Sequence, residues 1–324
     1  MTISFPILRR GWRRGIGTTV EVALVNLMPD AAFKETERQF ADLVTAVAGT
    51  LPFRLSYYAI TDTPRRDDVR ARVRARYRDI DELDAPAPDA LIVTGTEPRC
   101  AHLPEEDVWA RLSGLFGWAE ATGVSLFSSC MASHVALLAL DGVERRALPA
   151  KLSGVFPQWV HPSHPLTRGL DDVACPHSRL NEVPVEALPL HGYRVLVGSP
   201  EVGWSVAVRE GGGVTMLVQG HPEYDSTTLL REYRRDVRRF LEGVQEDYPP
   251  TPVGYLDADG VGLLELFRLA ATSRGADGSL MDSFPFHLCT QHICADWKGP
   301  MERLVGNWLH EVARRAAARW ATAG

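Results

Sequence analysis

Residues 125–140, SLFSSCMASHVALLAL, change from one structural pattern to another at their centre. The segment begins as a short apolar strand and ends as an amphipathic helix, with Cys130 at the junction. Ser128 and Ala132, two positions to either side, are small, as a tight turn requires where backbone atoms crowd. The segment therefore predicts a nucleophile elbow. Taken by itself, a cysteine here is also compatible with a buried thiol of the core.

The chain around this segment alternates between nearly continuous apolar strands and helices. Such alternation predicts an α/β fold with a mostly parallel central sheet and helices on both faces. Parallel sheets of this kind bind ligands at the carboxyl ends of their strands, and Cys130 lies at such an end. The predicted strands are 20–29, 53–60, 89–98 and 124–130, and the predicted helices are 35–49 and 105–123.

The pattern changes after residue 150. Three strands with short glycine turns, at 193–200, 203–210 and 213–220, are spaced like antiparallel neighbours, and a helix is predicted over 225–244. We expect one domain over residues 1–324. It has a less regular insertion or extension around 246–299, which opens with a Pro-, Gly- and Asp-rich loop over 246–260, and a C-terminal helix over 300–322.

The composition narrows the class of protein. The chain has 324 residues, 45% hydrophobic and 23% charged, and a net charge of −6, which gives no case for nucleic acid or membrane binding. No apolar run is long enough to span a bilayer, and the N-terminus lacks the order of a signal peptide, so we expect a cytoplasmic protein. Five cysteines do not suggest a disulfide framework, so reduced thiols are expected.

A base for Cys130 is available in the segment QGHPEYD, residues 219–225. His221 directly follows a predicted strand, and Glu223 is placed to orient the imidazole and stabilise its charged form. Nucleophile, base and orienting carboxylate are the three parts that covalent catalysis by cysteine requires. Alone, His221 would be read as an ordinary loop histidine, and only the pairing with the elbow favours catalysis.

The elbow and GHPEYD together resemble the flavodoxin-like fold of class I glutamine amidotransferases. More specifically, the chain resembles the homoserine O-succinyltransferase family, the acyltransferases of methionine biosynthesis. The resemblance covers roughly residues 20–245 and 296–311. The matching motifs, in the order of the family, are LVNLMP (24–29), TERQF (36–40), DALIVTG (89–95), KLSGV (151–155), HPLTRGLDD (164–172), PHSR (176–179), GHPEYD (220–225), RDV (235–237) and GNWLHE (306–311).

The resemblance implies roles for the elbow residues. Cys130 would carry the acyl group as a thioester, His221 would be the base, and Glu223 its partner. The N-terminus of the helix after Cys130 favours a thiolate. The oxyanion would lie between the backbone N–H of Met131 and that of Thr96, after Gly95.

Three further positions correspond to residues that hold the amino-acid substrate in the family: Lys151, Ser178 and Arg235. An arginine fork suits a carboxylate, and a serine suits a hydroxyl or ammonium group. Without the resemblance, they would be read as two surface cations and a turn-capping hydroxyl. The implied substrates are an acyl-CoA and a hydroxyl-bearing amino acid, with no cofactor, no metal and no nucleic acid or membrane partner. We expect a homodimer.

The sequence departs from the family in three places. The family has lysines directly after NLMP, whereas here Lys34 comes later and substitutes for them. Succinyl-using relatives carry Gly and acetyl-using relatives Glu at the acyl-selecting position, where an ungapped count places Arg99. A cation there favours a succinyl carboxylate. The family's Trp after the nucleophile is Met131 here.

Several alternatives stay open. Acetyl-CoA can replace succinyl-CoA as the donor, and serine or another amino alcohol can replace homoserine as the acceptor. A glutamine amidotransferase subunit is an alternative of another class, and a non-catalytic binding protein is a third. The sequence favours homoserine O-succinyltransferase chemistry.

Two other segments carry reactive or charged residues. Seven arginines between 65 and 78 can contact CoA phosphates, although a solvated helix or loop is favoured. The segment FHLCTQHIC, residues 286–294, holds His287, Cys289, His292 and Cys294, whose types suit zinc but whose spacing is not that of a zinc finger. We predict no metal.

Overall fold

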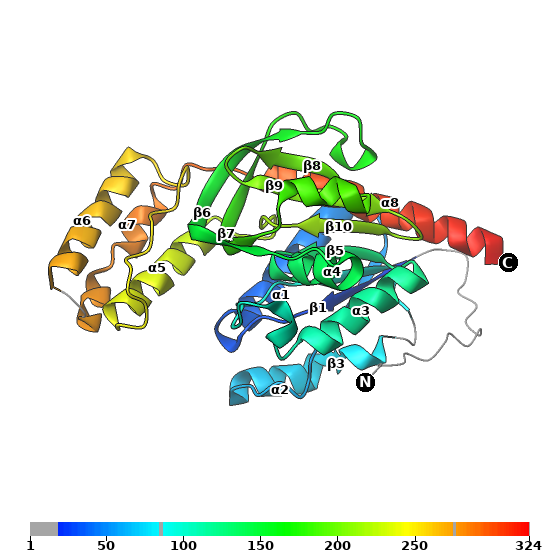
Figure 1. Ribbon diagram of the computed structural model, residues 1–324, viewed down its shortest axis with the longest axis horizontal. Helices are drawn as coiled ribbons and strands as arrows, with labels where there is room; N and C mark the ends of the chain where they lie inside the picture. The colour runs from blue at the N-terminus through cyan, green and yellow to red at the C-terminus, as the bar shows by residue number, and fades with distance from the viewer. Residues whose placement is uncertain (1–18, 84–86, 275–276, 324) are drawn as a thin grey trace.

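The computed structural model describes residues 19–83, 87–274 and 277–323. A central sheet crosses the molecule, with helices packed on its faces (Figure 1). The order of the strands is β3-β2-β1-β4-β5-β10-β9-β8-β6-β7. The strands are β1 (Val20–Val25), β2 (Phe53–Ala59), β3 (Tyr77–Asp79), β4 (Ala90–Val93), β5 (Ser125–Ser129), β6 (Arg146–Val160), β7 (Val173–Glu182), β8 (Arg194–Ser199), β9 (Gly203–Glu210) and β10 (Val214–Val218).

The first six strands in this order are parallel. The inner four, β1, β4, β5 and β10, are buried on both faces of the sheet. In β1, Val22 and Leu24 pack into one core, whereas Ala23 and Val25 pack into another on the opposite face. This alternation follows from the period-2 geometry of a strand. A strand with both faces covered has no polar side, which explains the continuous apolar pattern of the sequence.

Each face of the sheet is covered by helices, which complete the hydrophobic core on that face. Helices α1 (Asp30–Ala48) and α8 (Lys298–Ala323) pack on the Val22 face, and α3 (Trp109–Thr122) and α4 (Met131–Asp141) on the other. The predicted α/β fold is therefore confirmed. The other helices are α2 (Asp67–Arg76), α5 (Thr228–Leu241), α6 (Ala258–Arg274), α7 (Phe286–Thr290), η1 (Ile80–Glu82), η2 (Leu103–Glu105), η3 (Pro165–Thr167), η4 (Val185–His191) and η5 (Gly278–Ser283).

The second half of the sheet is antiparallel, as the glycine-linked strands predict. β10 joins the two halves, since it pairs antiparallel with β9 and parallel with β5. Three strands were not predicted. The short β3 forms one edge of the sheet, and β6 and β7 pair with each other at the other edge.

The structure departs most from the prediction at the start of the first helix and in the region 246–299. The first helix begins at Asp30 rather than at residue 35, directly after Pro29, whose fixed φ suits a helix start. The region 246–299 contains the 17-residue helix α6, whose start overlaps the predicted loop. The side chain of Asp257 accepts a hydrogen bond from the Gly260 N–H at 2.9 Å, which satisfies one free donor of the first turn. Helices α5, α6 and α7 group at one end of the molecule (Figure 1).

Across residues 19–83, 87–274 and 277–323, no helix combines the length and the apolar character needed to cross a membrane.

The sheet order brings three loops together. β4, β5 and β10 are adjacent and parallel, so their carboxyl ends lie at the same edge. Gly95 follows β4, Cys130 follows β5, and His221 follows β10 after a short turn. The fold therefore gathers the elbow and its predicted base at one place.

Substitution of Trp308, in α8, tests the packing of the core against β5. Its ring is 1% exposed and lies edge-on to Phe127 of β5, at 5.7 Å between ring centroids. We expect Trp308→Ala to lower the free energy of unfolding by about 3–5 kcal/mol, because it leaves a large cavity. Urea denaturation measures the change. The exposed Arg314→Ala, on the same helix, should change it by less than about 0.5 kcal/mol, and equal losses in both variants would contradict this packing.

Candidate active site

The backbone at Cys130 is strained. Its φ of 50° is the one positive value recorded for a non-glycine residue in the described part of the chain. Such a conformation costs of the order of 1–3 kcal/mol and persists only where its surroundings enforce it. Here the Cys130 N–H donates to the carbonyl of Val218 at 2.6 Å, and Ser133 Oγ donates to the Ser128 carbonyl at 2.6 Å. The turn is thus fixed to β5 and β10 at the N-terminus of α4.

Gly95 brings a second backbone segment against the elbow. A Cβ at this position would lie 3.3 Å from the Cβ of Cys130 and 3.6 Å from the backbone nitrogen of Met131. A side chain at this position would have to displace its neighbours by a few tenths of an ångström, so glycine suits this close approach. The Met131 N–H belongs to the first turn of α4, whose donors have no acceptor within the helix. The loop that carries Thr96 and the free donors of α4 therefore line the same part of the cavity.

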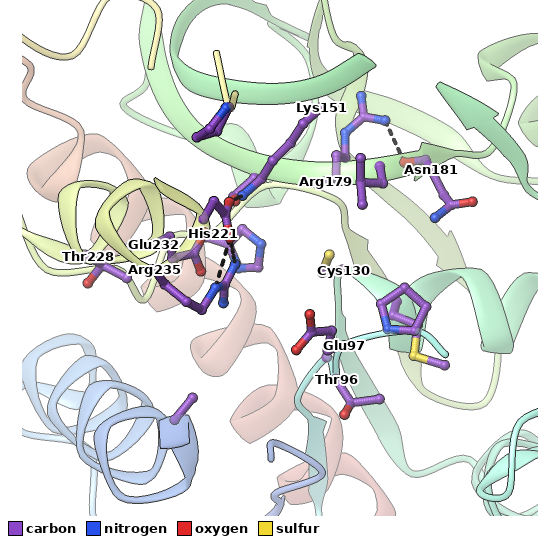
Figure 2. Close-up of a pocket in the computed structure, with 18 of the residues that line it drawn as sticks. Thr96, Glu97, Cys130, Lys151, Arg179, Asn181, His221, Thr228, Glu232 and Arg235 are labelled. Atoms are coloured by element: carbon purple, nitrogen blue, oxygen red, sulfur yellow. Dashed lines mark hydrogen bonds and ion pairs between the residues drawn. The ribbon is translucent and has the colours of Figure 1, made fainter. Parts of the chain in front are cut away.

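His221 is held by three contacts. Its Nδ1 lies 2.8 Å from Glu223 Oε1, its backbone N–H donates to the Pro176 carbonyl at 2.9 Å, and its ring stacks on Tyr224 at 4.2 Å. These contacts leave the buried Nε2 without a hydrogen-bond partner among the described residues. Figure 2 shows the imidazole and the sulfur of Cys130 in the same pocket. The arrangement suits transfer of a proton at Nε2.

The charge state of His221 depends on its neighbours. Burial alone would lower the pKa of its imidazole, but the Glu223 carboxylate and the Cys130 sulfur together raise that pKa well above the ordinary value. The site therefore favours the charged imidazolium form of His221 next to Cys130. An imidazolium is a group that can stabilise a thiolate, the nucleophilic form of cysteine.

The wall opposite the elbow carries a network of charges. Lys151 of β6 lies 2.5 Å from Asp236 of α5, and Arg235 also contacts Asp236, at 2.9 Å (Figure 2). Ser178 of β7 faces Ser153 of β6 and lines the same cavity. Burial would raise the pKa of the Asp236 carboxyl, but Lys151 and Arg235 hold it below its usual range. The carboxylate thus orients two cations at the pocket wall.

The cavity has a volume of about 1180 Å³. It is lined by the elbow, by His221 and by the three predicted substrate residues Lys151, Ser178 and Arg235. The fold therefore brings together eight of the ten predicted site residues or their immediate backbone, from the loops after β4, β5 and β10 and from β6, β7 and α5.

Known proteins resemble the chain over most of its length. The profile of the homoserine O-succinyltransferase family matches residues 13–318. Proteins named homoserine O-succinyltransferase from Rhodopseudomonas palustris and Bradyrhizobium japonicum are both 40% identical, over 93% and 90% of this chain and 90% of each relative. The chain belongs to the homoserine O-succinyltransferase family.

A solved structure agrees on the fold of this family member. A glutamine amidotransferase from Methylobacillus flagellatus matches with a TM-score of 0.51, at 12% identity, over 91% of this chain and 96% of that one. At this identity the match concerns the fold alone. It confirms the predicted amidotransferase-like architecture.

The two residues predicted to select the acyl group, Arg99 and Lys34, lie outside the cavity. The side chain of Arg99 is 77% exposed and reaches toward Asp107 at 3.9 Å. Lys34 is half exposed and pairs with Asp68 of α2 at 2.8 Å. Neither lines the pocket, so the geometry does not support a role for either in selecting the acyl group.

Several charged residues that line the cavity were not predicted, among them Glu97, Arg145 and Arg239. Glu97 follows Thr96 and pairs with Arg239 of α5 at 2.6 Å, and Arg145 lies between α4 and β6. The loop residue Glu97 precedes Arg99 by two positions, and Arg239 recurs one helical turn after Arg235. This i, i+4 spacing was the available signal for Arg239.

The other charged or reactive segments also lie outside the cavity. The arginine run 65–78 belongs mainly to α2, where Arg72 contacts Glu37 at 2.6 Å and Arg65 stacks on Phe33. None of its arginines lines the pocket. Residues 286–290 form the helix α7. Within the described residues, no group of three His, Cys, Asp or Glu side chains is placed to hold a metal ion.

The raised pKa of His221 can be tested through its carboxylate partner. Glu223→Gln leaves burial opposed only by the sulfur, so we expect the pKa of His221 to fall. The imidazole should stay protonated at neutral pH in the wild type and become neutral there in the variant. NMR titration of the histidine side-chain nitrogens measures this. The exposed Glu186→Gln is the control, and an unchanged His221 titration in Glu223→Gln would refute the assigned coupling.

Proposed function

We propose that this protein is a homoserine O-succinyltransferase, which transfers the succinyl group of succinyl-CoA to the hydroxyl of L-homoserine in methionine biosynthesis. The observation that carries the proposal is the placement of Cys130, His221 and Glu223 in one cavity, in a chain of this family. The reaction needs a nucleophile, a base that also returns protons, and space for two substrates in turn.

In the first half-reaction, the Cys130 thiolate attacks the thioester carbonyl of succinyl-CoA. The oxyanion that forms accepts hydrogen bonds from the backbone N–H groups of Met131 and Thr96. The carbon–sulfur bond to CoA then breaks, and the departing thiolate takes the proton from His221. A succinyl thioester on Cys130 and a neutral imidazole remain.

In the second half-reaction, the neutral His221 accepts the proton of the homoserine hydroxyl, whose oxygen attacks the thioester. Collapse of this intermediate releases O-succinylhomoserine and restores the Cys130 thiolate beside an imidazolium. Arg235 and Lys151 bind the carboxylate of homoserine, and Ser178 binds its polar groups. The two substrates react in turn, so ping-pong kinetics follow. No cofactor takes part in either step.

Proposals on assembly and location accompany this function. We expect a homodimer and a cytoplasmic location, and neither affects the mechanism within one chain. Sedimentation of the purified protein measures the first.

The nucleophile is tested by intact-protein mass spectrometry after mixing with succinyl-CoA or acetyl-CoA in the absence of acceptor. We expect the wild type to gain the mass of one succinyl group, and Cys130→Ala to gain none and to lose turnover by about 10³-fold or more. The control is Cys294→Ala, whose thiol is exposed and outside the cavity.

Three results would count against the proposal. Turnover retained by Cys130→Ala would remove the thioester route. An acetyl adduct without a succinyl adduct would change the donor. Ammonia release from glutamine, without an adduct from either CoA thioester, would favour the amidotransferase reaction.

The acceptor residues are tested by separating the two half-reactions. Arg235→Met should raise the KM for homoserine about 10- to 100-fold, because it removes a charge-assisted fork to the carboxylate. Acylation of Cys130 should keep its rate. The control is Arg238→Met, on the same helix and outside the cavity. Equal effects of Arg235→Met on both half-reactions, or a preference for serine over homoserine, would contradict the assigned acceptor.

A further inference from the structure

The cations of the cavity differ in their partners. Five of them lie within 4 Å of a carboxylate: Lys151 and Arg235 at Asp236, Arg179 at Glu182, Arg231 at Glu35, and Arg239 at Glu97. Arg145 also lines the cavity, and no carboxylate of the described residues lies within this distance of it. One positive charge at the wall therefore lacks an ion-pair partner.

The surroundings of Arg145 fix the guanidinium without neutralising it. Its Nη2 donates to the carbonyls of Cys100 at 2.7 Å and Ala101 at 3.3 Å. Its Nε is buried and has no hydrogen-bond partner among the described residues. The acid that acts on it most strongly, Glu106, already accepts bonds from the backbone N–H groups of Arg99 and Cys100. A guanidinium held only by carbonyls keeps its full positive charge, so an anionic ligand would gain from this site.

Arg145 is also electrostatically coupled to the nucleophile. Burial lowers the pKa of its guanidinium, and the negative charges of Glu106 and of the Cys130 thiolate oppose that effect. The positive charge of Arg145 therefore interacts with the sulfur of Cys130, to which the acyl group would be attached. The phosphates of CoA are separated from the thioester by a long pantetheine arm, whereas the succinyl carboxylate is separated from it by only two methylene groups.

We propose that Arg145 binds the terminal carboxylate of the succinyl group, both in the donor and in the acyl-enzyme, and so selects succinyl over uncharged acyl groups. This inference rests on the proposed function. The proposal assigns the choice of acyl group to Arg145, which contacts the loop 99–101, and not to Arg99, whose side chain faces solvent. The same carboxylate supplies the counter-charge that the described residues do not give Arg145. Glu97 does not repel it fully, because Arg239 neutralises Glu97.

The test compares two donors of equal chain length, succinyl-CoA and butyryl-CoA, which lacks the carboxylate. Acylation of Cys130 without acceptor is followed by quenched flow and intact mass. We expect Arg145→Met to slow succinylation about 100-fold and to change butyrylation by less than about threefold. The control is Arg146→Met, whose side chain is exposed and pairs with Glu182 outside the cavity. It should leave both rates unchanged.

A second variant distinguishes the loss of carboxylate binding from a general loss of structure in Arg145→Met. Arg145→Lys keeps the charge but loses the planar fork, so succinylation should slow about 10-fold while butyrylation stays constant. If both donors slow equally in both variants, Arg145 only supports the loop 99–101 and the proposal is wrong. Unchanged succinylation in Arg145→Met would also overturn it. A wild type that forms no succinyl adduct would instead refute the proposed function, which separates the two failures.

Discussion

The hydrogen bonds that join β5 to β10 at the elbow determine the geometry of the site. The Cys130 N–H donates to the Val218 carbonyl, and Ser133 Oγ donates to Ser128 while it accepts from the Val218 N–H at 3.0 Å. These bonds enforce the positive φ of Cys130, which an isolated turn would not maintain. Val218 ends the strand that leads to His221, so Cys130 and His221 are fixed by the same contacts. Their relative position is a property of the sheet rather than of two independent loops.

The parts of the fold with local signals were predictable from the sequence. Continuous apolar runs identify β1, β4 and β5, and small residues around Cys130 identify the elbow. The strands β6 and β7 were missed because their pattern is irregular: β6 contains Pro149 and Pro157, and its register with β7 shifts between Ala147 and Leu152. Such strands can be identified only from their pairing with neighbouring strands, not from their own sequence pattern. α6 was missed because a loop-like composition precedes and overlaps its first turn.

The site was predictable where chemistry depends on spacing along the chain, as in the pair His221 and Glu223. It was not predictable where chemistry depends on the direction of a side chain. Counting residues along the loop after Gly95 placed the acyl selector at Arg99, which faces solvent, whereas Glu97 lines the cavity. Arg145 gave no signal of its own, since its significance lies in the absence of a nearby carboxylate, and only three-dimensional proximity reveals this.

The strands β6 and β7, at the edge of the sheet, carry Lys151 and Ser178, whereas the nucleophile and base belong to the interior parallel strands. In the proposed reaction, bond-making and acceptor recognition therefore belong to different strands of one sheet. Under these proposed roles, substitutions in β6 and β7 would change which amino alcohol binds and would leave the strained turn intact. In a fold arranged in this way, substitutions in the edge strands can change the substrate while the hydrogen bonds that fix Cys130 stay the same.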